Sequence, residues 1–389
     1  MKNGSITFSS ANRIGIANAD GSGERYLSFP VPGQARWALG PQFPHSRRIL
    51  LTSYEDVTIS RVVAGEVRTR TWIYDLDSEA IQPALTHEQP AAFTYCHSLL
   101  PGETRAAVNA FLDGEERLFT MDLDGGQVQE LTAPGEGFTY GVDLSPAGDR
   151  FAFHVTGSKL AQARQAVWFQ PGAYSINTLG VDGRGRTLVA GQPGHLYFGP
   201  RWSPRGDWLV YLDCHCAADP AHFWADICIG HPDGSEHRVV TTGQRHWFGT
   251  TFGTREKRGG GSNLATWTPD GRQVTYTRAA PASHPDCEYH PELPDHCECV
   301  YNPDAARGGT QICLLDPFSG QVEELTAFEE GKWDFRPACS PAGDSLVFTR
   351  ARLGQPSELW MVNRDGSGEH LLARGLDGAG ADHGRWLIG

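Results

Sequence analysis

The sequence has little basic charge and no long apolar run. Lys and Arg number 33 against 46 Asp and Glu among 389 residues, which gives a formal net charge of −13 at pH 7. Because nucleic-acid backbones are bound by basic faces, this balance argues against a nucleic-acid partner. No stretch approaches the roughly 20 apolar residues of a membrane span, and the initial MKNGSITFSS has no apolar core of a signal peptide. We therefore expect a cytoplasmic protein without a membrane partner.

The sequence also lacks the cysteine pattern of a disulfide scaffold. Nine cysteines is an odd number, and such scaffolds scatter their cysteines along the chain. Here six of the nine fall into two clusters, which are Cys214, Cys216 and Cys228, and Cys287, Cys297 and Cys299. Reduced thiols or thiolate metal ligands are the better interpretation.

Glycine and proline, in contrast, are abundant and spread along the whole chain. The 46 glycines and 25 prolines predict many turns between short strands, and they disfavour a helical bundle. A hydrophobic fraction of 39% is enough for a large core, so the composition is that of an ordered globular protein.

One pattern returns seven times: a short apolar strand, a turn of the Asp-Gly type, and a second strand. Two clear copies are LFTMDLDGGQVQELT from Leu118 and ICLLDPFSGQVEELT from Ile312. Asp-Gly and Gly-Ser turns between such strands are typical of β-hairpins, because glycine accepts the positive φ of tight turns. Seven copies indicate a repeat architecture.

A second unit precedes most copies and consists of a strand, an S/T-P-x-G-D/R turn and an apolar strand, as in DLSPAGDRFAFHV. Two hairpins per repeat make a four-stranded antiparallel blade. Residues 5–28 supply only three strands, and ADHGRWLI near the C-terminus supplies a lone one. We therefore predict an all-β, seven-bladed β-propeller, a single domain over residues 1–389 that is closed by N- and C-terminal strands sharing one blade.

These S-P-x-G and D-G-x-x-x-x-L-T units resemble the TolB-type, WD40-like propeller repeats, over nearly the whole chain. The resemblance implies the β-propeller fold. It does not choose a function, because such propellers include scaffold proteins, peptidase gating domains and polysaccharide lyases.

In a propeller the innermost strand of each blade lines the central channel. The residues just before each S-P turn are therefore the candidates for the channel and its mouth. They are Arg36, Gln42, Tyr95, His97, Tyr140, Asp143, His195, Tyr197, Arg201, Ser262, Asn263, Lys332, Trp333, Asp334, Arg336, Asp382, His383 and Arg385. Arg, His, Tyr and Trp bind and act on sugar acids; in the alternative, many of these side chains only hydrogen-bond neighbouring blades.

Two insertions interrupt the repeat, at residues 213–226 and 280–308. Together they hold five cysteines and five histidines, and a tetrahedral zinc with mixed Cys and His ligands would fix such long loops. We predict zinc, or another divalent metal, bound by His222, His284, Cys297 and Cys299. A disulfide, free thiols or chance are the alternatives, because the Cys-x-Cys spacing is tighter than in most zinc ribbons.

The connection over residues 242–263 is basic and aromatic in an otherwise acidic chain. A guanidinium binds a carboxylate with two hydrogen bonds, and an aromatic ring stacks on the apolar face of a sugar. We predict that the substrate-binding residues are Arg36, Arg245, His246, Trp247, Asn263, Trp333, Arg336 and His383. The alternative is a solvated loop.

The repeats together with this channel resemble the propeller polysaccharide lyases, the oligogalacturonate and ulvan lyase group. The resemblance implies β-elimination at a uronic acid, so the expected partner is an acidic oligosaccharide. The tight His-rich metal motif of the oligogalacturonate enzymes is absent near the C-terminus, which counts against pectin fragments as the substrate.

Such a lyase must neutralise the carboxylate, remove the proton next to it and protonate the leaving oxygen. The segment GHLYFGPRW offers His195, Tyr197 and Arg201, and strand alternation predicts that all three share one face. We expect Arg201 to neutralise the carboxylate and His195 and Tyr197 to exchange the proton. His97 or Tyr140 would assist from neighbouring blades.

Two other functions stay open. A non-catalytic, TolB-like propeller would bind a glycan or a protein partner with the same groups. A glycosidase would use paired carboxylates, which Asp143, Asp334 and Asp382 could supply. A serine peptidase is disfavoured, since no G-x-S-x-G elbow accompanies a helix. The patterns leave the sugar, the linkage and the oligomeric state open.

Overall fold

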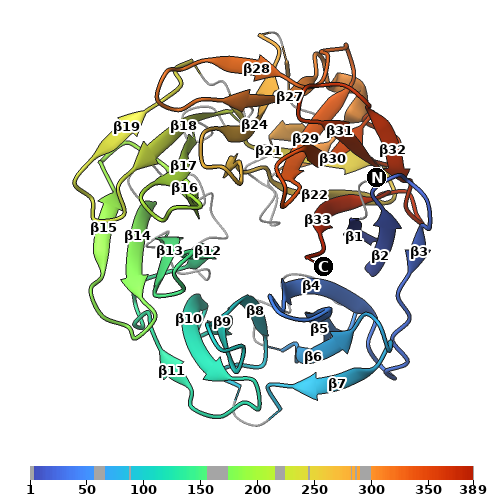
Figure 1. Ribbon diagram of the computed structural model, residues 1–389. Coiled ribbons are helices and arrows are strands. Elements are labelled where there is room, and N and C mark those ends of the chain that lie inside the picture. The colour runs from blue at the N-terminus through green and yellow to red at the C-terminus, as the bar shows by residue number, and fades with distance from the viewer. Residues whose placement is uncertain are drawn as a thin grey trace.

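The computed structural model describes residues 4–56, 66–86, 89–155, 174–214, 224–243, 246–281, 283–284, 287–289 and 299–388. These residues form β-strands arranged as a ring (Figure 1). The one helical element among them is a short 3-10 helix, η2 (Pro303–Ala305). In the same ranges, no helix is long and apolar enough to cross a membrane. The predicted all-β class is confirmed.

Four sheets of the ring are separate, with four antiparallel strands each. One joins β33 (Asp382–Trp386), β1 (Ser5–Ser10), β2 (Arg13–Asn18) and β3 (Arg25–Tyr26). The next joins β4 (Arg36–Gln42), β5 (Arg48–Tyr54), β6 (Arg70–Asp75) and β7 (Ile81–Ala84). A third joins β8 (Thr94–Leu99), β9 (Arg105–Leu112), β10 (Glu115–Asp122) and β11 (Gln129–Glu130). The fourth joins β12 (Thr139–Leu144), β13 (Arg150–Val155), β14 (Ser175–Gly180) and β15 (Thr187–Ala190).

The rest of the ring belongs to one thirteen-stranded sheet. Its first antiparallel run contains β16 (Tyr197–Trp202), β17 (Leu209–Cys214), β18 (Trp224–Gly230) and β19 (His237–Val239). The second contains β23 (Thr266–Trp267), β24 (Val274–Ala279), β27 (Thr310–Leu315) and β28 (Val322–Glu324). The third contains β29 (Trp333–Cys339), β30 (Ser345–Ala351), β31 (Glu358–Asn363) and β32 (His370–Ala373). The count of seven blades stays a prediction, because these three runs are joined.

Short strands make the junctions and two extra hairpins. β20 (His246–Trp247) pairs with both β18 and β24, and β27 has one parallel contact with β29. The hairpins are β21 (Gly249–Gly253) with β22 (Arg258–Ser262), and β25 (Cys287–Tyr289) with β26 (Cys299–Tyr301). The β21–β22 hairpin lies in the basic 242–263 connection, and the β25–β26 hairpin lies in the 280–308 insertion.

The two ends of the chain meet in one sheet. β33 pairs antiparallel with β1, with Ile6 opposite Trp386. The backbone NH of Leu387 also donates to the carbonyl of Ser5, at 2.9 Å. The predicted closure by shared terminal strands is confirmed, and it covers an edge of β1 that would otherwise be free to pair elsewhere.

The S-P turns of the repeat share one hydrogen-bond pattern. The hydroxyl of Ser145 donates to the carboxylate of Asp149 at 2.7 Å and accepts from the backbone NH of Arg150 at 3.2 Å. Two further turns repeat the hydroxyl–carboxylate bond at 2.7 Å, namely Ser203 with Asp207 and Ser340 with Asp344. The motif thus encodes the turn that leads from each innermost strand to the next.

The core lies between neighbouring sheets. Val210, Leu212 and Ile227 of β17 and β18 are fully buried and pack with Val274 and Tyr276 of β24. Because side chains alternate along a strand, each sheet contributes to a core cluster on either side of it. This packing fixes the innermost strands, which carry the candidate site.

Candidate functional site

The innermost strands share an irregularity. In β12, β16, β29 and β33, two residues lie opposite a single residue of the neighbouring strand. Such a β-bulge shifts the alternation of side chains by one residue and re-aims those near it. The first bulged residues are Gly141, Gly199, Arg336 and His383.

A pocket of about 720 Å³ lies where β33, β4 and the β21–β22 hairpin meet. The wall residues that matter below are Arg36, Phe252, Lys257, Asp382, His383 and Arg385. Two predicted substrate-binding residues, Arg36 and His383, thus line the same pocket. The hairpin from the basic connection forms another part of its wall.

The glycine run of this connection lets the hairpin lie close to the ring. A Cβ on Gly259 would lie 2.6 Å from the ring of Phe252, and one on Gly261 would lie 2.9 Å from the guanidinium of Arg336. The backbone NH of Thr254 donates to the carbonyl of Gly378 at 2.9 Å, which holds the hairpin near β33. The close approach explains the glycines, because a Cβ at either position would collide with a neighbouring side chain.

Asp382 lies at the centre of a buried ion-pair group. Its carboxylate contacts Arg336 Nη1, His383 Nδ1 at 2.8 Å and the hydroxyl of Thr349 at 2.8 Å. Burial opposes ionisation of this carboxyl, but the positive charges of Arg336 and His383 hold the pKa of Asp382 well below its usual range. The ionised carboxylate keeps a proton on His383 Nδ1 and leaves Nε2 for the pocket.

Arg201 and Arg385 bring positive charge to the inside of the ring. Arg201 Nη1 donates to the carbonyl of Gly141 at 3.0 Å, and Arg385 Nη1 to that of Gly40 at 3.3 Å. Within the described ranges, neither has a carboxylate at ion-pair distance. Desolvation and the charge of Arg201 lower the pKa of Arg385, and burial lowers that of His97 to about 3, helped by both arginines. This region favours an anionic ligand.

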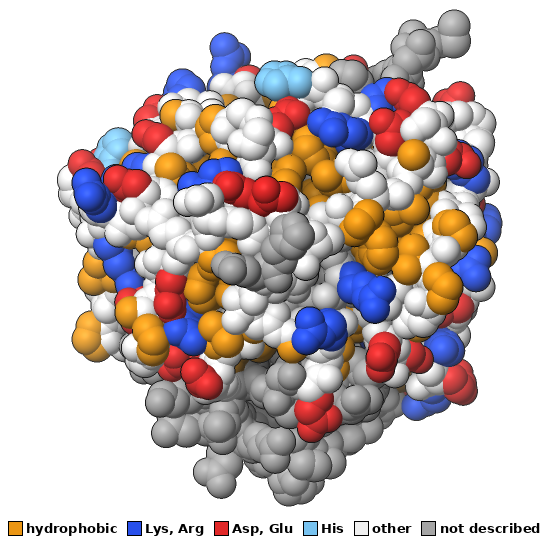
Figure 2. Space-filling view, turned by 90° about the horizontal axis from the view of Figure 1, so that it is seen from below, with side chains coloured by type: hydrophobic (Ala, Val, Ile, Leu, Met, Phe, Trp, Pro, Cys, Tyr) orange, Lys and Arg blue, Asp and Glu red, His pale blue; other side chains and the backbone are white. Residues whose placement is uncertain are grey.

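The outer surface differs from this interior. Figure 2 shows a face on which Lys and Arg side chains are interspersed with Asp and Glu. A mixed surface of this kind has no extended field of one sign. The two arginines without carboxylate partners therefore stand out as a local feature of the inner strands.

The prediction that His195, Tyr197 and Arg201 share one face of the strand is wrong for Arg201. His195 and Tyr197 do lie together, with their rings stacked and the centroids 5.4 Å apart. The bulge that begins at Gly199 shifts the alternation, so the register puts Trp202 on the side of Tyr197 in place of Arg201. The Gly-Pro pair inside this strand was the sequence signal for the bulge.

His195 and Tyr197 lie in different surroundings. His195 Nδ1 is 2.6 Å from Asp213 Oδ2, and the histidine side chain is 44% exposed. Tyr197 is only 1% exposed and packs on Tyr211 and His237, and burial raises its pKa. His195 is thus an accessible, oriented imidazole, whereas Tyr197 belongs to the core.

The two residues expected to assist catalysis lie in a buried polar network. Tyr95 and Asn109 both donate to the carboxylate of Glu116, which also interacts with Tyr140. Burial raises the pKa of Glu116 to about 7 despite these hydrogen bonds, and it raises that of Tyr140 as well. His97 stacks beside Tyr95, with ring centroids 4.9 Å apart. The structure therefore gathers these residues around a buried carboxylate, and His97 and Tyr140 themselves are half-buried.

Four predicted substrate-binding residues are buried, three in the connection and one in β29. Trp247 and Trp333 have almost no exposed surface, and their ring centroids are 5.0 Å apart. His246 Nε2 is 2.7 Å from the carbonyl of Asn263, and burial lowers the pKa of His246 to about 4. The Asn263 side chain accepts from the backbone NH of Arg336 at 2.9 Å. These residues join the connection to β29.

Some predicted residues lie outside the described ranges, namely Arg245, His222 and Cys297. Of the other predicted metal ligands, His284 makes an isolated β-bridge with Arg307, and Cys299 lies opposite Tyr289 in the β25–β26 hairpin. Among the residues that can be placed, no three His, Cys, Asp or Glu side chains form a group able to hold a metal ion. The metal site stays a prediction.

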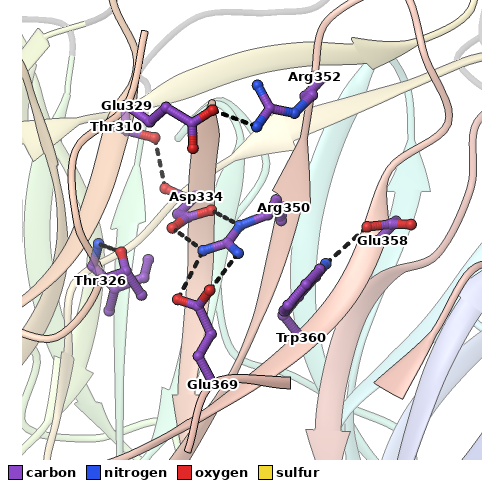
Figure 3. A network of polar contacts seen from close by, with 10 residues as sticks. Thr310, Thr326, Glu329, Asp334, Arg350, Arg352, Glu358, Trp360 and Glu369 are labelled. Atoms are coloured by element: carbon purple, nitrogen blue, oxygen red, sulfur yellow. Dashed lines mark hydrogen bonds and ion pairs between the residues drawn. The ribbon is translucent and has the colours of Figure 1, made fainter. Parts of the chain in front are cut away.

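The carboxylates considered for glycoside hydrolysis have other partners. Arg350 donates to both oxygens of Asp334, at 2.6 and 2.8 Å, and also to Glu369 at 2.7 Å (Figure 3). Asp382 is held by Arg336. Burial raises the pKa of Asp143, which accepts a backbone hydrogen bond at 2.9 Å. Each carboxylate is engaged within the protein, which disfavours the glycosidase alternative.

Comparison with known proteins rests on solved structures. No family model matches the chain, and no curated protein matches it. The chain is similar to a puromycin hydrolase mutant complexed with PGG, at 16% identity and a TM-score of 0.57, over 96% of this chain and 52% of that one. It is similar to an oligogalacturonate lyase in complex with manganese, at 15% identity and a TM-score of 0.52, over 95% of this chain and 85% of that one. TolB from Acinetobacter baumannii matches at 14% identity and a TM-score of 0.48, over 96% of this chain and 78% of that one.

The matched structures with a TM-score above 0.5 include oligogalacturonate lyase, one of the groups that the repeats resemble. The predicted resemblance is confirmed. At such identities the likeness establishes a propeller-like fold and leaves function to be argued from the site. The chain spans about half of the puromycin hydrolase.

Proposed function

We propose that this protein binds acidic oligosaccharides in the pocket beside β33 and cleaves them by β-elimination at a uronic acid. The observation that carries the proposal is Arg385, a guanidinium of the pocket wall that has no carboxylate at ion-pair distance among the described residues. Arg201 lies outside the pocket lining but near enough to lower the pKa of Arg385. A guanidinium at a pocket wall without a carboxylate partner favours a bound carboxylate. The likeness in fold to an oligogalacturonate lyase agrees with this proposal.

The proposed chemistry needs an anion site and a base. A guanidinium bound to the uronate carboxylate stabilises the negative charge that develops when the neighbouring proton leaves. A neutral imidazole takes that proton, the C–O bond to the leaving sugar breaks, and the leaving oxygen takes up a proton. The products are an unsaturated uronate and a new sugar end. His195 and His383 are both paired with an aspartate, so each is oriented for proton transfer.

The blade count is part of the proposal. Each of the three joined runs has four antiparallel strands, as each of the four separate sheets does. The runs are β16–β19, β23–β24–β27–β28 and β29–β32. If each run is one blade, the ring has seven blades in a single domain. The junctions through β20 and the one parallel contact would then be links between blades.

A metal in the two insertions is also proposed. The expected ligands are His222, His284, Cys297 and Cys299, with zinc or another divalent ion. The oligogalacturonate lyase of similar fold is in complex with manganese, which supports a divalent ion in general. A metal with these ligands would hold the 213–226 and 280–308 loops together, and the elimination steps above are assigned to side chains alone. We retain the cytoplasm as the proposed location.

A non-catalytic glycan-binding or protein-binding propeller is the second candidate. The burial of Tyr197, Trp247 and Trp333 favours it, because fewer of the predicted groups can reach a ligand. Burial also raises the pKa of Tyr140 and Tyr197, which keeps both phenols protonated. Binding without turnover would need only the arginines.

The test is Arg385→Gln with oligouronates of several types as substrates, followed by the ultraviolet absorbance of the unsaturated product. We expect turnover by the wild type and a loss of about 10- to 100-fold in kcat/KM for the variant, since a charged hydrogen bond contributes about 1.5–3 kcal/mol. Arg47→Gln is the matched control, because Arg47 lies outside the pocket lining and is paired with Asp77 at 2.8 Å. We expect a change of less than about threefold for it. Binding without product would favour the second candidate, and neither binding nor product would overturn the proposal.

A further inference from the structure

Two side chains of the site occupy a backbone position that glycine takes elsewhere in the ring. The first bulged residues of β12 and β16 are Gly141 and Gly199, with φ of 59° and 61°. At the same register in β29 and β33 stand Arg336 and His383, with φ of 54° and 57°. This left-handed region strains residues that have a Cβ, and such strain concentrates at functional sites.

The strained conformation makes a contact that a regular strand does not allow. Neighbouring residues of a strand point to opposite faces. At the bulge of β33 the side chains of Asp382 and His383 instead meet, with Nδ1 2.8 Å from the carboxylate oxygen. Arg336 reaches the same oxygen from the equivalent bulge of β29. Each of the two bulges therefore brings a side chain to the same carboxylate, that of Asp382.

Arg336 is held from several sides and still has an unused donor. Its backbone NH donates to the Asn263 side chain at 2.9 Å, and Nε donates to the carbonyl of Ser262 at 3.2 Å. Its guanidinium is 8% exposed, and within the described part of the chain Nη2 has no hydrogen-bond partner. Nη2 lies beside Gly261 of the hairpin that walls the pocket. A buried donor without a partner next to a pocket points to a ligand or solvent contact.

We propose that Arg336, Asp382 and His383 form a strained acid–base centre in which His383 is the catalytic base. Arg336 is a positioning residue, because it fixes Asp382, and Asp382 orients His383. His383 lines the pocket together with Arg385, which would bind the carboxylate. This inference rests on the proposed function, and it assigns the role of base to His383 in place of His195.

The proton and the electron pair of the elimination step are both accounted for within the pocket. His383 Nε2 takes the proton next to the uronate carboxylate, and the electron pair left behind forms the new double bond as the C–O bond breaks. The imidazolium formed gives its proton to the leaving oxygen, which returns His383 to the neutral form. Asp382 stabilises the imidazolium in between, because its negative charge faces Nδ1.

The test uses His383→Ala, His383→Gly and His195→Ala in the full-length protein, with product absorbance as the readout. We expect both His383 variants to lose at least about 100-fold in kcat, the usual range for removal of a general base, and His195→Ala to lose less than either of them. Activity retained by His383→Gly, or lost only in His195→Ala, would overturn the inference. An inactive wild type would instead contradict the proposed function.

Thermal unfolding measures the backbone strain at His383 independently of its role in catalysis. Glycine relieves the left-handed φ, so His383→Gly should raise the melting temperature by about 2 °C relative to His383→Ala. Gln127→Gly is the matched control, since Gln127 has a φ of 49° in an exposed turn, and it should gain stability without losing activity. Equal melting temperatures for the two His383 variants would contradict the strain.

The role of Arg336 has its own readout. Replacing Arg336 by Gln removes the contact that fixes Asp382, and with it the orientation of His383. We expect kcat to fall while KM stays the same, and Arg336→Lys, which keeps the positive charge, to recover part of the lost kcat. A loss of kcat that Arg336→Lys does not reduce would mean that Arg336 is only structural.

Discussion

The two His–Asp pairs of the inner strands differ in how the backbone brings their members together. His195 stands just before β16 and reaches Asp213 of the adjacent strand β17, at 2.6 Å. His383 reaches its own neighbour Asp382, at 2.8 Å, and Arg336 joins them. The first pair follows from ordinary strand register, whereas the second depends on a residue with φ of 57°.

The two pairs also differ in their position relative to the pocket. Asp382 and His383 line the pocket beside β33, and His195 is absent from the wall residues in the described part of the chain. A strained conformation persists only where its surroundings over-determine it, here through Arg336 and Thr349. An accessible histidine beside an aspartate is therefore a weaker sign of a functional centre than a strained one that lines a pocket.

The largest expected effect is on the buried carboxylates. Asp382→Asn leaves the Arg336 guanidinium buried without its negative partner, so we expect a loss of about 3–5 kcal/mol in the free energy of unfolding. Asp213→Asn keeps a hydrogen-bond acceptor next to a half-exposed histidine, and we expect a loss of about 1 kcal/mol. Urea titrations of both variants measure the difference. Equal losses would remove the distinction between the pairs.

A smaller effect is expected from placing a side chain at a glycine bulge. In Gly199→Ala the new Cβ would lie 2.5 Å from Leu264 Cδ2 at a φ of 61°, and we expect a loss of about 2 kcal/mol. Gly320→Ala is the control, because Gly320 has a φ of 76° with no atom near its Cβ, and it should lose about 1 kcal/mol. If Gly199→Ala were neutral, the bulge would tolerate side chains freely, and His383 would not be strained.

The smallest effect, counted per pH unit, concerns a buried histidine of β13. Burial lowers the pKa of His154 to about 3 from an ordinary 6.5, so the unfolded chain binds a proton there that the folded protein does not. Stability therefore falls as pH drops below 6.5, by about 1.4 kcal/mol per pH unit down to about pH 3. Melting curves between pH 7 and 4 should show a shallower slope for His154→Gln than for the wild type.

Much of the fold was predictable because its signals are local. The Asp-Gly hairpins and the S-P turns are encoded in a few adjacent residues, as the Ser145–Asp149 bond shows. The lone strand that contains Asp382 was recognisable as the missing partner of β1. The joining of two runs through β20 was not, since two-residue strands leave no pattern.

The site was predictable in part. Arg36 and His383 were expected near a ligand and line the pocket, while Trp247 and Trp333 were expected there and are buried. Arg201 was placed on the wrong side of its strand, because one bulge reverses every later side chain. A signal for the site was nevertheless present in the sequence. At the bulge position where β12 and β16 have Gly141 and Gly199, β29 has Arg336 and β33 has His383.

The sequence by itself determined the β-strand repeat, its turns and the closure of the ring by both ends of the chain, because hairpins and alternation depend on neighbouring residues. Only the tertiary structure decided which polar side chains meet. The contact of Arg336 with Asp382 joins residues 46 positions apart, and it depends on the bulges and on the packing of β29 beside β33. Such distances are set by how sheets pack, which no local pattern records.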